Sequence, residues 1–316
     1  MKKLNMERSS KKFRPPLTCI ELLEEFEKKR MPLTGEKLLF SGVGGRDVYN
    51  ISKPFFSGKN GKKTIIAGRV EVREACADSK IIFFEKKKNG VWTPVYGTPT
   101  LSLEDCFVVK IGDETIIGGV EVYRNPTSTD SYNVDYRTVF YRGRNLSSLR
   151  KFAVGPDGMK DIRLTPLVNG RIGVFTRPQG GENGNGKIGY IELLRLEEIT
   201  PKNLLRARII ENQFSHGEWG GVNDSYSFKK WIYVYGHIAY QDGVGAKHYY
   251  GMSFTYDPKR HRASPIRIIA SRKNFPEGEA KTPNHKDIFF LGGIVRHCKI
   301  VTIYGGLSDT GSGLCK

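Results

Sequence analysis

The sequence lacks several features that would assign it to a common class. None of its 316 residues belongs to an apolar run of about 18, so no membrane-spanning helix is expected. The basic residues 1–16 are not followed by an apolar segment, which does not fit a secretory signal. The five cysteines are widely spaced, with no C-x-x-C pair, and predict free thiols in a reducing compartment. We therefore expect a cytoplasmic protein.

Common catalytic motifs are also missing. There is no H-E-x-x-H and no Cys/His grouping with zinc spacing, so no metal is expected. G-x-S-x-G is absent, which leaves a serine hydrolase unsupported. The glycine-rich segment 180–187 has no Ser or Thr after Lys187 and precedes no helix, so it predicts a hairpin loop instead of a P-loop.

The formal net charge is +18, from 51 Lys and Arg against 33 Asp and Glu. Nine of the cations and five of the acids fall in the first 30 residues, so the remaining chain still carries +14. Charge alone permits a nucleic-acid partner, but no helix-turn-helix, zinc-finger or RNA-binding signature is present. We expect neither a nucleic-acid nor a membrane partner, and the oligomeric state is left open.

One helix and many short strands are predicted. Thr18 can cap a helix over 19–30, with Glu21 at the capping-box position. The 36 glycines favour turns, and strands rich in Ile, Val, Phe and Tyr recur every 8–15 residues from about residue 38. Without intervening helices, this pattern favours an all-β fold: a sandwich, a barrel or a propeller.

The length selects among these folds. An all-β region of 280 residues is large for one sandwich, whereas five blades of about 55 residues each account for it. We therefore predict an all-β, five-bladed β-propeller with a short N-terminal helix. Residues 1–35 form the basic segment and helix, and residues 36–316 form a single catalytic propeller domain. The segments 123–136 and 215–226 are expected to be loops.

Two groups of acidic residues are candidates for catalysis. Glu104 and Asp105 precede a predicted strand over 107–111, where burial beside apolar residues could raise the pKa of a general acid. The alternative is that Asp105 only caps a turn. Arg69 and Glu71 share one face of the predicted strand 64–72, so they are either a paired, buried polar site or a surface ion pair on an edge strand.

Cations gather near the ends of two predicted strands. Lys160, Arg163 and Arg177 fall in one local double strand, and arginine and lysine suit phosphate. Each cation alone is more typical of a solvated surface. His237 ends the predicted aromatic strand 231–235, where it either binds an anion or hydroxyl or is a satisfied core histidine.

The ordered set of motifs resembles glycoside hydrolase family 130. It is more similar still to the domain of unknown function 1861, whose relatives include the mannosyltransferase/phosphorylases of glycosyltransferase family 108. The motifs that carry the resemblance extend from about residue 40 to Asp309, and are Val48-Tyr49-Asn50-Ile51, Gly68-Arg69-Val70-Glu71, Glu104-Asp105, Gly155 to Asp161, Thr176-Arg177-Pro178 and Tyr304 to Asp309.

The resemblance implies a five-bladed propeller that cleaves β-mannosides with phosphate. It assigns Asp105 as the general acid, which acts through a hydroxyl of the bound mannose. It places the remaining contacts in two sets: Asn50, Arg69, Glu104 and Asp309 on the sugar, and Lys160, Arg177 and His237 at phosphate. Cys106 and Phe107 replace the family's Pro-Arg, Thr176 replaces its His, and Tyr235-Gly236-His237 permutes Tyr-His-Gly.

The resulting hypothesis is an inverting β-1,2-mannoside phosphorylase or mannosyltransferase, a glycosyltransferase of carbohydrate metabolism. It would move mannosyl units between mannose oligosaccharides and phosphate, mannose 1-phosphate or nucleotide-mannose. An inverting phosphorylase needs one acid and a cation cluster, with inorganic phosphate as co-substrate and no other cofactor. The alternatives are an inverting β-mannoside hydrolase, with Glu218 or Glu121 as base, and a non-catalytic carbohydrate-binding propeller.

Overall fold

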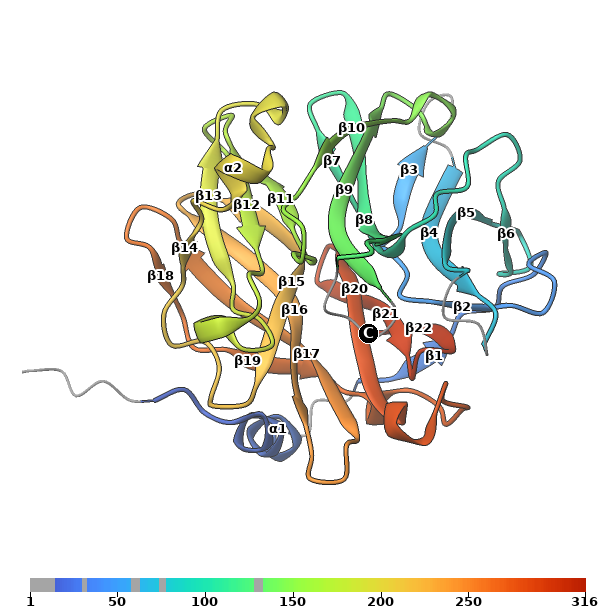
Figure 1. The fold of residues 1–316 in the computed structure, drawn as a ribbon. Helices are drawn as coiled ribbons and strands as arrows, with labels where there is room; N and C mark the ends of the chain where they lie inside the picture. Colours follow the sequence, from blue (N-terminus) through green and yellow to red (C-terminus); the bar gives the residue numbers. More distant parts are fainter. Residues whose placement is uncertain (1–14, 30–32, 58–62, 74–77, 128–132) are drawn as a thin grey trace, which may run out of the picture.

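A computed structural model describes residues 15–29, 33–57, 63–73, 78–127 and 133–316. Most of the basic N-terminal segment, residues 1–14, lies outside the described residues. The strands form five consecutive blades that follow one another around a ring (Figure 1). Together with the N-terminal helix, this confirms the predicted five-bladed propeller.

The first three blades are separate antiparallel sheets. Blade 1 contains β2 (Asp47–Tyr49), β3 (Phe55–Ser57), β4 (Lys63–Glu71), β5 (Lys80–Lys86) and β6 (Trp92–Pro94). Blade 2 contains β7 (Glu104–Ile111), β8 (Glu114–Arg124), β9 (Val134–Gly143) and β10 (Arg150–Val154). Blade 3 contains β11 (Arg163–Pro166), β12 (Ile172–Thr176), β13 (Gly189–Leu193) and β14 (Arg208–Ile209).

The last two blades share hydrogen bonds. Blade 4 contains β15 (Trp219–Phe228), β16 (Trp231–Gln241), β17 (Lys247–Asp257), β18 (Arg262–Ala263) and β19 (Arg267–Ala270). Blade 5 contains β20 (Asp287–His297), β21 (Ile300–Leu307), β22 (Gly311–Cys315) and β1 (Gly35–Lys37). A short parallel pairing of β17 with β20 joins the two blades into one sheet, so the five blades form four hydrogen-bonded sheets.

The N-terminal strand closes the ring. β1 pairs with β22, with Gly35 opposite Cys315. The last blade is therefore completed by residues from the other end of the chain, which ties the two ends together. The predicted boundary between residues 35 and 36 falls at the start of this strand.

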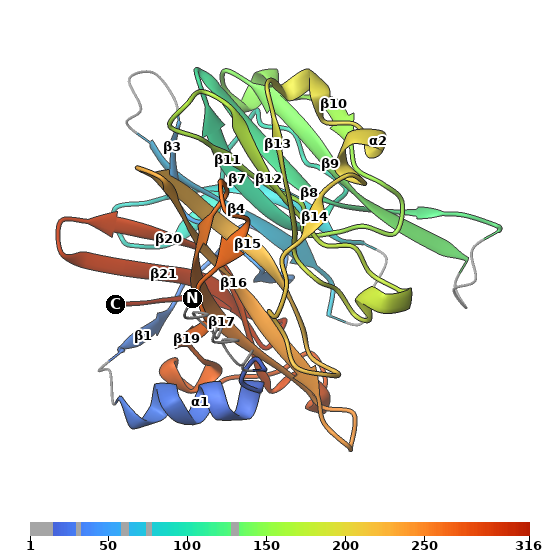
Figure 2. The same ribbon diagram turned by 90° about the vertical axis from the view of Figure 1, so that its left-hand side faces the viewer.

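The first strand of every blade begins on the same face of the ring, which we call the entry face. The chain then descends to the opposite face and turns back through the hairpins β3–β4, β7–β8, β11–β12, β15–β16 and β20–β21. We call this opposite face the hairpin face. In Figure 2 the β20–β21 hairpin projects to the left, whereas the β16–β17 hairpin, from the entry face, projects to the lower right.

Helix α1 (Cys19–Lys28) begins with the predicted capping box, because Glu21 N donates to Thr18 Oγ1 and Thr18 N donates to Glu21. It ends earlier than residue 30, with Lys29 as its C-cap. Cys19, Leu22 and Phe26 are buried in the core that blades 3 and 4 share. A one-turn helix, α2 (Pro201–Leu204), and short 3₁₀ turns connect the strands elsewhere.

Two details of the sequence prediction need correction. Residues 219–226 form most of β15, the innermost strand of blade 4, and not a loop. This strand is rich in Gly, Asn, Asp and Ser because it lines the centre of the ring, so it lacks the apolar signal of an ordinary strand. The segment 123–136 likewise contains the end of β8 and the start of β9. Within the described residues, no helix is long and apolar enough to cross a membrane.

Candidate active site

Asp105 lies at the centre of a group that three strands bring together on the entry face. Its Oδ1 accepts hydrogen bonds from Asn50 Nδ2 at 2.8 Å and from Arg69 Nη1 at 3.3 Å. Asn50 directly follows β2, Arg69 lies on β4, and Asp105 is the second residue of β7. Glu104 and Asp105 thus belong to the strand itself, at a β-bulge between Glu104 and Phe107 that re-aims their side chains.

Arg69 pairs with three neighbouring carboxylates. Its Nη2 lies 3.0 Å from both Glu71 Oε2 and Glu104 Oε1. The Arg69 side chain is 11% exposed and that of Glu71 is 1% exposed, so burial requires this pairing. Because β4 lies between β2 and β5, the alternative of a surface ion pair on an edge strand is wrong. Burial raises the pKa of Glu104, and the charge of Asp105 adds to this, while Arg69 and Lys160 oppose it.

Lys281, which the sequence motifs did not indicate, also binds in the group around Arg69 and Glu71. Lys281 Nζ lies 3.2 Å from Glu71 Oε1, and Tyr49 donates its hydroxyl to the other oxygen of Glu71. Lys281 comes from the segment between β19 and β20, and no motif marks it in the sequence. Glu71 is therefore held by two cations and a hydroxyl, and its role is to position Arg69.

Asp309, after β21, belongs to the same electrostatic neighbourhood. Burial raises its pKa to about 6, with a further increase from the charge of Asp105, against the opposing charges of Arg69 and Lys281. His285 Nε2 lies 3.8 Å from Asp309 Oδ2. Residues about 200 positions apart in the sequence are thus close enough to influence one another's protonation.

Unusual backbone conformations coincide with this site. Asn50, Asp105, Asp161 and Asp309 have φ angles of 45°, 47°, 58° and 55°, in the left-handed region. Asn and Asp tolerate this region better than other non-glycine residues, but it still costs free energy. Such strain is typical of functional sites, where it fixes the direction of a side chain.

The predicted cations form a second cluster around Asp161. Arg177 Nη1 donates to Asp161 Oδ2 at 2.7 Å, and Arg163 Nη2 lies 3.4 Å from Asp161 Oδ1. All three side chains are nearly inaccessible to solvent. Burial alone would raise the pKa of Asp161, but Arg177, with His237 and Arg163, holds it well below its usual range. Asp161 therefore organises the cations whose motif the sequence analysis identified.

His237 is a buried residue within a strand, which corrects its predicted place at a strand end. β16 continues past residue 235 to Gln241, and register places His237 opposite Gly221 of β15. Its Nδ1 is 2.8 Å from Asn223 Oδ1, and its Nε2 is 4.0 Å from Asp161 Oδ2. Burial lowers the pKa of His237 to about 3 although Asp161 opposes this, and the nearby Arg177 adds to the lowering. The imidazole is therefore neutral at physiological pH.

Acid is expected to destabilise the folded protein through His237. An unfolded histidine takes up a proton near pH 6.5, whereas the buried His237 stays neutral down to about pH 3. Between these pH values the unfolded state binds one more proton, so the free energy of unfolding decreases as the pH falls from 6.5 toward 3. Between pH 7.5 and pH 5, the wild type should lose about 2 kcal/mol of unfolding free energy relative to the variant His237→Gln. Urea unfolding of both proteins at both pH values measures this, and equal losses in the two would contradict it.

Lys160 lies between the two clusters. Its Nζ is 5.8 Å from the centroid of the Tyr136 ring. Its charge lowers the pKa of Glu104 in the first cluster and the pKa values of Asp161 and His237 in the second. Lys160 is only partly buried, whereas Arg163 and Arg177 are buried.

Glycines permit the close packing in both clusters. A Cβ on Gly221 would lie 3.0 Å from His237 Cε1 and 3.1 Å from Asp161 Oδ2. A Cβ on Gly306 would lie 2.2 Å from Asn50 Oδ1. Two aromatic residues line the second cluster: Tyr249 stacks on His237 at 5.5 Å and accepts a hydrogen bond from Trp219 Nε1.

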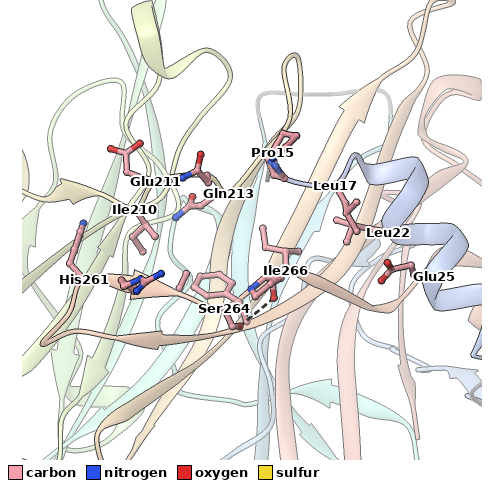
Figure 3. A pocket seen from close by; sticks show the side chains of 16 residues that line it. Pro15, Leu17, Leu22, Glu25, Ile210, Glu211, Gln213, His261, Ser264 and Ile266 are labelled. Atoms are coloured by element: carbon pink, nitrogen blue, oxygen red, sulfur yellow. Dashed lines mark hydrogen bonds between the residues drawn. The ribbon is translucent and has the colours of Figure 1, made fainter. Parts of the chain in front are cut away.

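A cavity of about 670 Å³ lies elsewhere, at the outer edge of blade 4 beside α1 (Figure 3). Leu22, Ile210, Phe254, His261 and Ile266 are among its lining residues. None of the predicted site residues lines this cavity, so it is separate from the two clusters.

Within the described part of the chain, no group of three His, Cys, Asp or Glu side chains is arranged to hold a metal ion. Cys19, Cys106, Cys298 and Cys315 are free thiols, as predicted, and Cys76 lies outside the described residues.

The family follows from comparison with known proteins. A family model described as "Protein of unknown function (DUF1861)" matches residues 24–315. The chain belongs to the DUF1861 family. This confirms the relationship predicted from the motifs. Among curated proteins, none matches this DUF1861 member.

Solved structures from Leishmania mexicana are similar over nearly the whole DUF1861 chain. MPT-4, a mannose phosphorylase in complex with phosphate ion, is 34% identical, with 94% of this chain and 91% of MPT-4 covered and a TM-score of 0.85. MPT-1, a GDP-Man-dependent mannosyltransferase, is 32% identical, with 94% of both chains covered and a TM-score of 0.83. A β-1,2-mannobiose phosphorylase from Listeria innocua is 14% identical, with 86% of this chain and 90% of the Listeria chain covered and a TM-score of 0.58. That last likeness shows the fold alone.

Proposed function

We propose that this DUF1861 protein is an inverting β-mannoside phosphorylase or mannosyltransferase, with β-1,2-linked mannose oligosaccharides as substrates. The observation that carries the proposal is the proximity of an acidic group and a cationic group at one end of the ring. Asp105, held by Asn50 and Arg69, belongs to the acidic group. The charge of Lys160 acts on Glu104 in the acidic group and on Asp161 in the cationic group. Similarity to a mannose phosphorylase and to a mannosyltransferase supports the same reaction class.

In the proposed reaction Asp105 supplies the proton. The glycosidic bond of the mannoside breaks, and its oxygen leaves with that proton, relayed through a hydroxyl of the bound mannose. A phosphate oxygen attacks the anomeric carbon from the other face, so the product is mannose 1-phosphate with inverted configuration. Asn50, Arg69, Glu104 and Asp309 bind the sugar hydroxyls. Because phosphate is already an anion, the reaction needs no second carboxylate as base.

The cation cluster holds the attacking phosphate. With His237 neutral, Lys160, Arg163 and Arg177 leave two positive charges after pairing with Asp161. Arg177 already donates to Asp161 and to the carbonyl of Asn185, whereas Lys160 is partly exposed. Lys160 therefore binds phosphate directly, and Arg177 supports the site by its positive charge. The neutral His237 contributes only the hydrogen-bonding capacity of its ring.

A specific observation weakens the hydrolase alternative. Its base was expected to be Glu121 or Glu218, but Glu121 pairs with Arg137 and Lys151. Glu218 accepts a hydrogen bond from the backbone of Cys19, at the start of α1. Glu121 is therefore neutralised by two cations, and Glu218 is held at α1, although its Oε2 has no hydrogen-bond partner among the described residues. In the part of the chain that the structure describes, neither carboxylate pairs with a member of the Asp105 group.

The cytoplasmic location, predicted from the cysteines, stays a prediction.

Product analysis tests the proposal. The purified chain is incubated with β-1,2-mannobiose and longer oligosaccharides, with and without phosphate, and in parallel with GDP-mannose. Mannose 1-phosphate that forms only with phosphate is the expected result, and chain elongation from GDP-mannose would assign the transferase branch. Free mannose without phosphate would instead assign a hydrolase. Binding without any product would leave a carbohydrate-binding propeller.

A further inference from the structure

The hairpin face, opposite the candidate active site, is strongly cationic on three neighbouring blades. The strand ends and turns of blades 1, 4 and 5 bring exposed cations to this face: Lys63, Lys86, Lys87, Lys88, Lys229, Lys230, Arg296 and Lys299. The sequence has no Asp or Glu in residues 225–241 or 288–308, and only Glu85 in residues 79–95. Glu85 pairs with Lys63 and Lys87, so most of these charges are unopposed.

Large apolar side chains are exposed at the same turns. Phe56, beside the β3–β4 turn, is 75% exposed, Phe228 at the β15–β16 turn is 55% exposed, and Ile300 at the β20–β21 turn is 56% exposed. The ammonium groups of Lys229 and Lys230 lie over the rings of Phe228 and Trp231, at 5.6 and 5.0 Å from the centroids. Each apolar tip therefore has lysine beside it.

The three blades that carry these tips adjoin one another. Blade 5 lies between blades 4 and 1 in the ring, and Arg296 Nη1 donates to Tyr226 Oη at 3.0 Å across the junction of blades 5 and 4. Lys53 of blade 1 pairs with Asp224 of blade 4 at 2.6 Å, and Asp224 also accepts from Ile294 N of blade 5 at 3.0 Å. The β7–β8 turn of blade 2 differs, because it carries Asp113 and Glu114. Acidic residues thus interrupt the cationic surface at blade 2.

We propose that this surface binds peripherally to membranes that contain acidic phospholipids. Apolar tips flanked by lysines are the chemistry of interfacial binding: the tips enter the headgroup region and the ammonium groups contact lipid phosphates. A single-stranded nucleic acid also carries phosphates, but it needs aromatic platforms in a groove. Here the exposed residues project from turns, and the aliphatic Ile300 cannot stack on a base, so the membrane fits better.

The surface leaves the candidate active site free. Asp105 and Lys160 lie toward the entry face, so a sugar chain can enter from the solvent while the hairpin face is on a membrane. The inference is independent of the proposed function, since it rests on other residues.

Vesicle co-sedimentation of the full chain tests the proposal. The protein is mixed with vesicles of phosphatidylcholine alone or with equal parts of phosphatidylcholine and phosphatidylserine. Binding to the acidic vesicles only, weakened by added salt, is expected. The double variant Lys229→Gln/Lys230→Gln should bind them about 25-fold more weakly, at about fivefold for each lysine. The matched control Lys28→Gln/Lys29→Gln removes the same charge from α1 and should change little.

Variants that replace the exposed apolar side chains distinguish binding to a membrane from binding to a soluble polyanion. Phe228→Ser and Ile300→Ser should each weaken vesicle binding about tenfold, whereas Val244→Ser, at an 84% exposed position of the entry-face β16–β17 hairpin, should not. Three outcomes would overturn the proposal: no binding to acidic vesicles, equal loss in the control variants, or apolar variants that bind normally while a single-stranded oligonucleotide displaces the vesicles. The last outcome would identify the surface as a nucleic-acid site.

Discussion

The variant Asp105→Asn is expected to transfer mannosyl units at least 10²–10⁴-fold more slowly than the wild type, with its fold intact. Asparagine has the shape of aspartate but cannot give up a proton to the leaving oxygen. Its amide oxygen can still accept from Asn50 and Arg69, which hold Oδ1 at 2.8 and 3.3 Å. The rate of phosphate-dependent product release measures the effect, and circular dichroism with thermal unfolding checks the fold.

A matched control makes this result specific. Asp113→Asn makes the same chemical change on the exposed β7–β8 turn, at the other end of the strand that carries Asp105, and should leave the rate unchanged. If Asp105→Asn keeps wild-type activity, Asp105 is not the acid and the assignment of the first cluster is wrong. An inactive variant that is also unfolded would be replaced by Asp105→Ser, which removes the acid with a smaller side chain.

The variant Asp161→Asn is expected to lose about 3–5 kcal/mol of unfolding free energy. Asp161 is 2% exposed and balances the guanidinium groups of Arg163 and Arg177, which are 2% and 3% exposed. Asparagine would leave two buried cations without a carboxylate, and burial of unpaired charge is costly. Urea unfolding at neutral pH measures the change.

The same loop offers the control for this prediction. Asp157 is mostly exposed, accepts a hydrogen bond from Tyr123 Oη at 2.6 Å and lies 3.7 Å from Arg137. Asp157→Asn should cost no more than about 1 kcal/mol, since exposed ion pairs contribute little. Similar stability of Asp161→Asn and the wild type would contradict the view that Asp161 organises the cation cluster.

Sequence patterns predicted strands well where one face of the strand is apolar. The segments 64–72 and 249–256 carry that signal and correspond to β4 and β17 within two residues at each end. The pattern failed at β15, because this innermost strand is largely buried but has Gly, Asn and Asp where an ordinary strand has apolar residues. It also ended β16 too early, before His237, for the same reason: buried polar side chains interrupt the apolar alternation.

The sequence by itself determined the class of fold, the family and the types of residue that meet in the site. Motifs such as Glu104-Asp105 and Thr176-Arg177-Pro178 are local, so they can be read along the chain. The tertiary structure alone decided how these motifs combine. Asp309 comes from blade 5, and Lys281 comes from the segment before that blade, yet both lie at the first cluster. Asp161 pairs with Arg163 at the start of β11 and with Arg177 just after β12. These residues meet because the closed ring brings the entry-face ends of the inner strands of the blades close to one axis. Likewise the lysines and apolar tips of the hairpin face are scattered in sequence and form one surface only where blades 4, 5 and 1 adjoin.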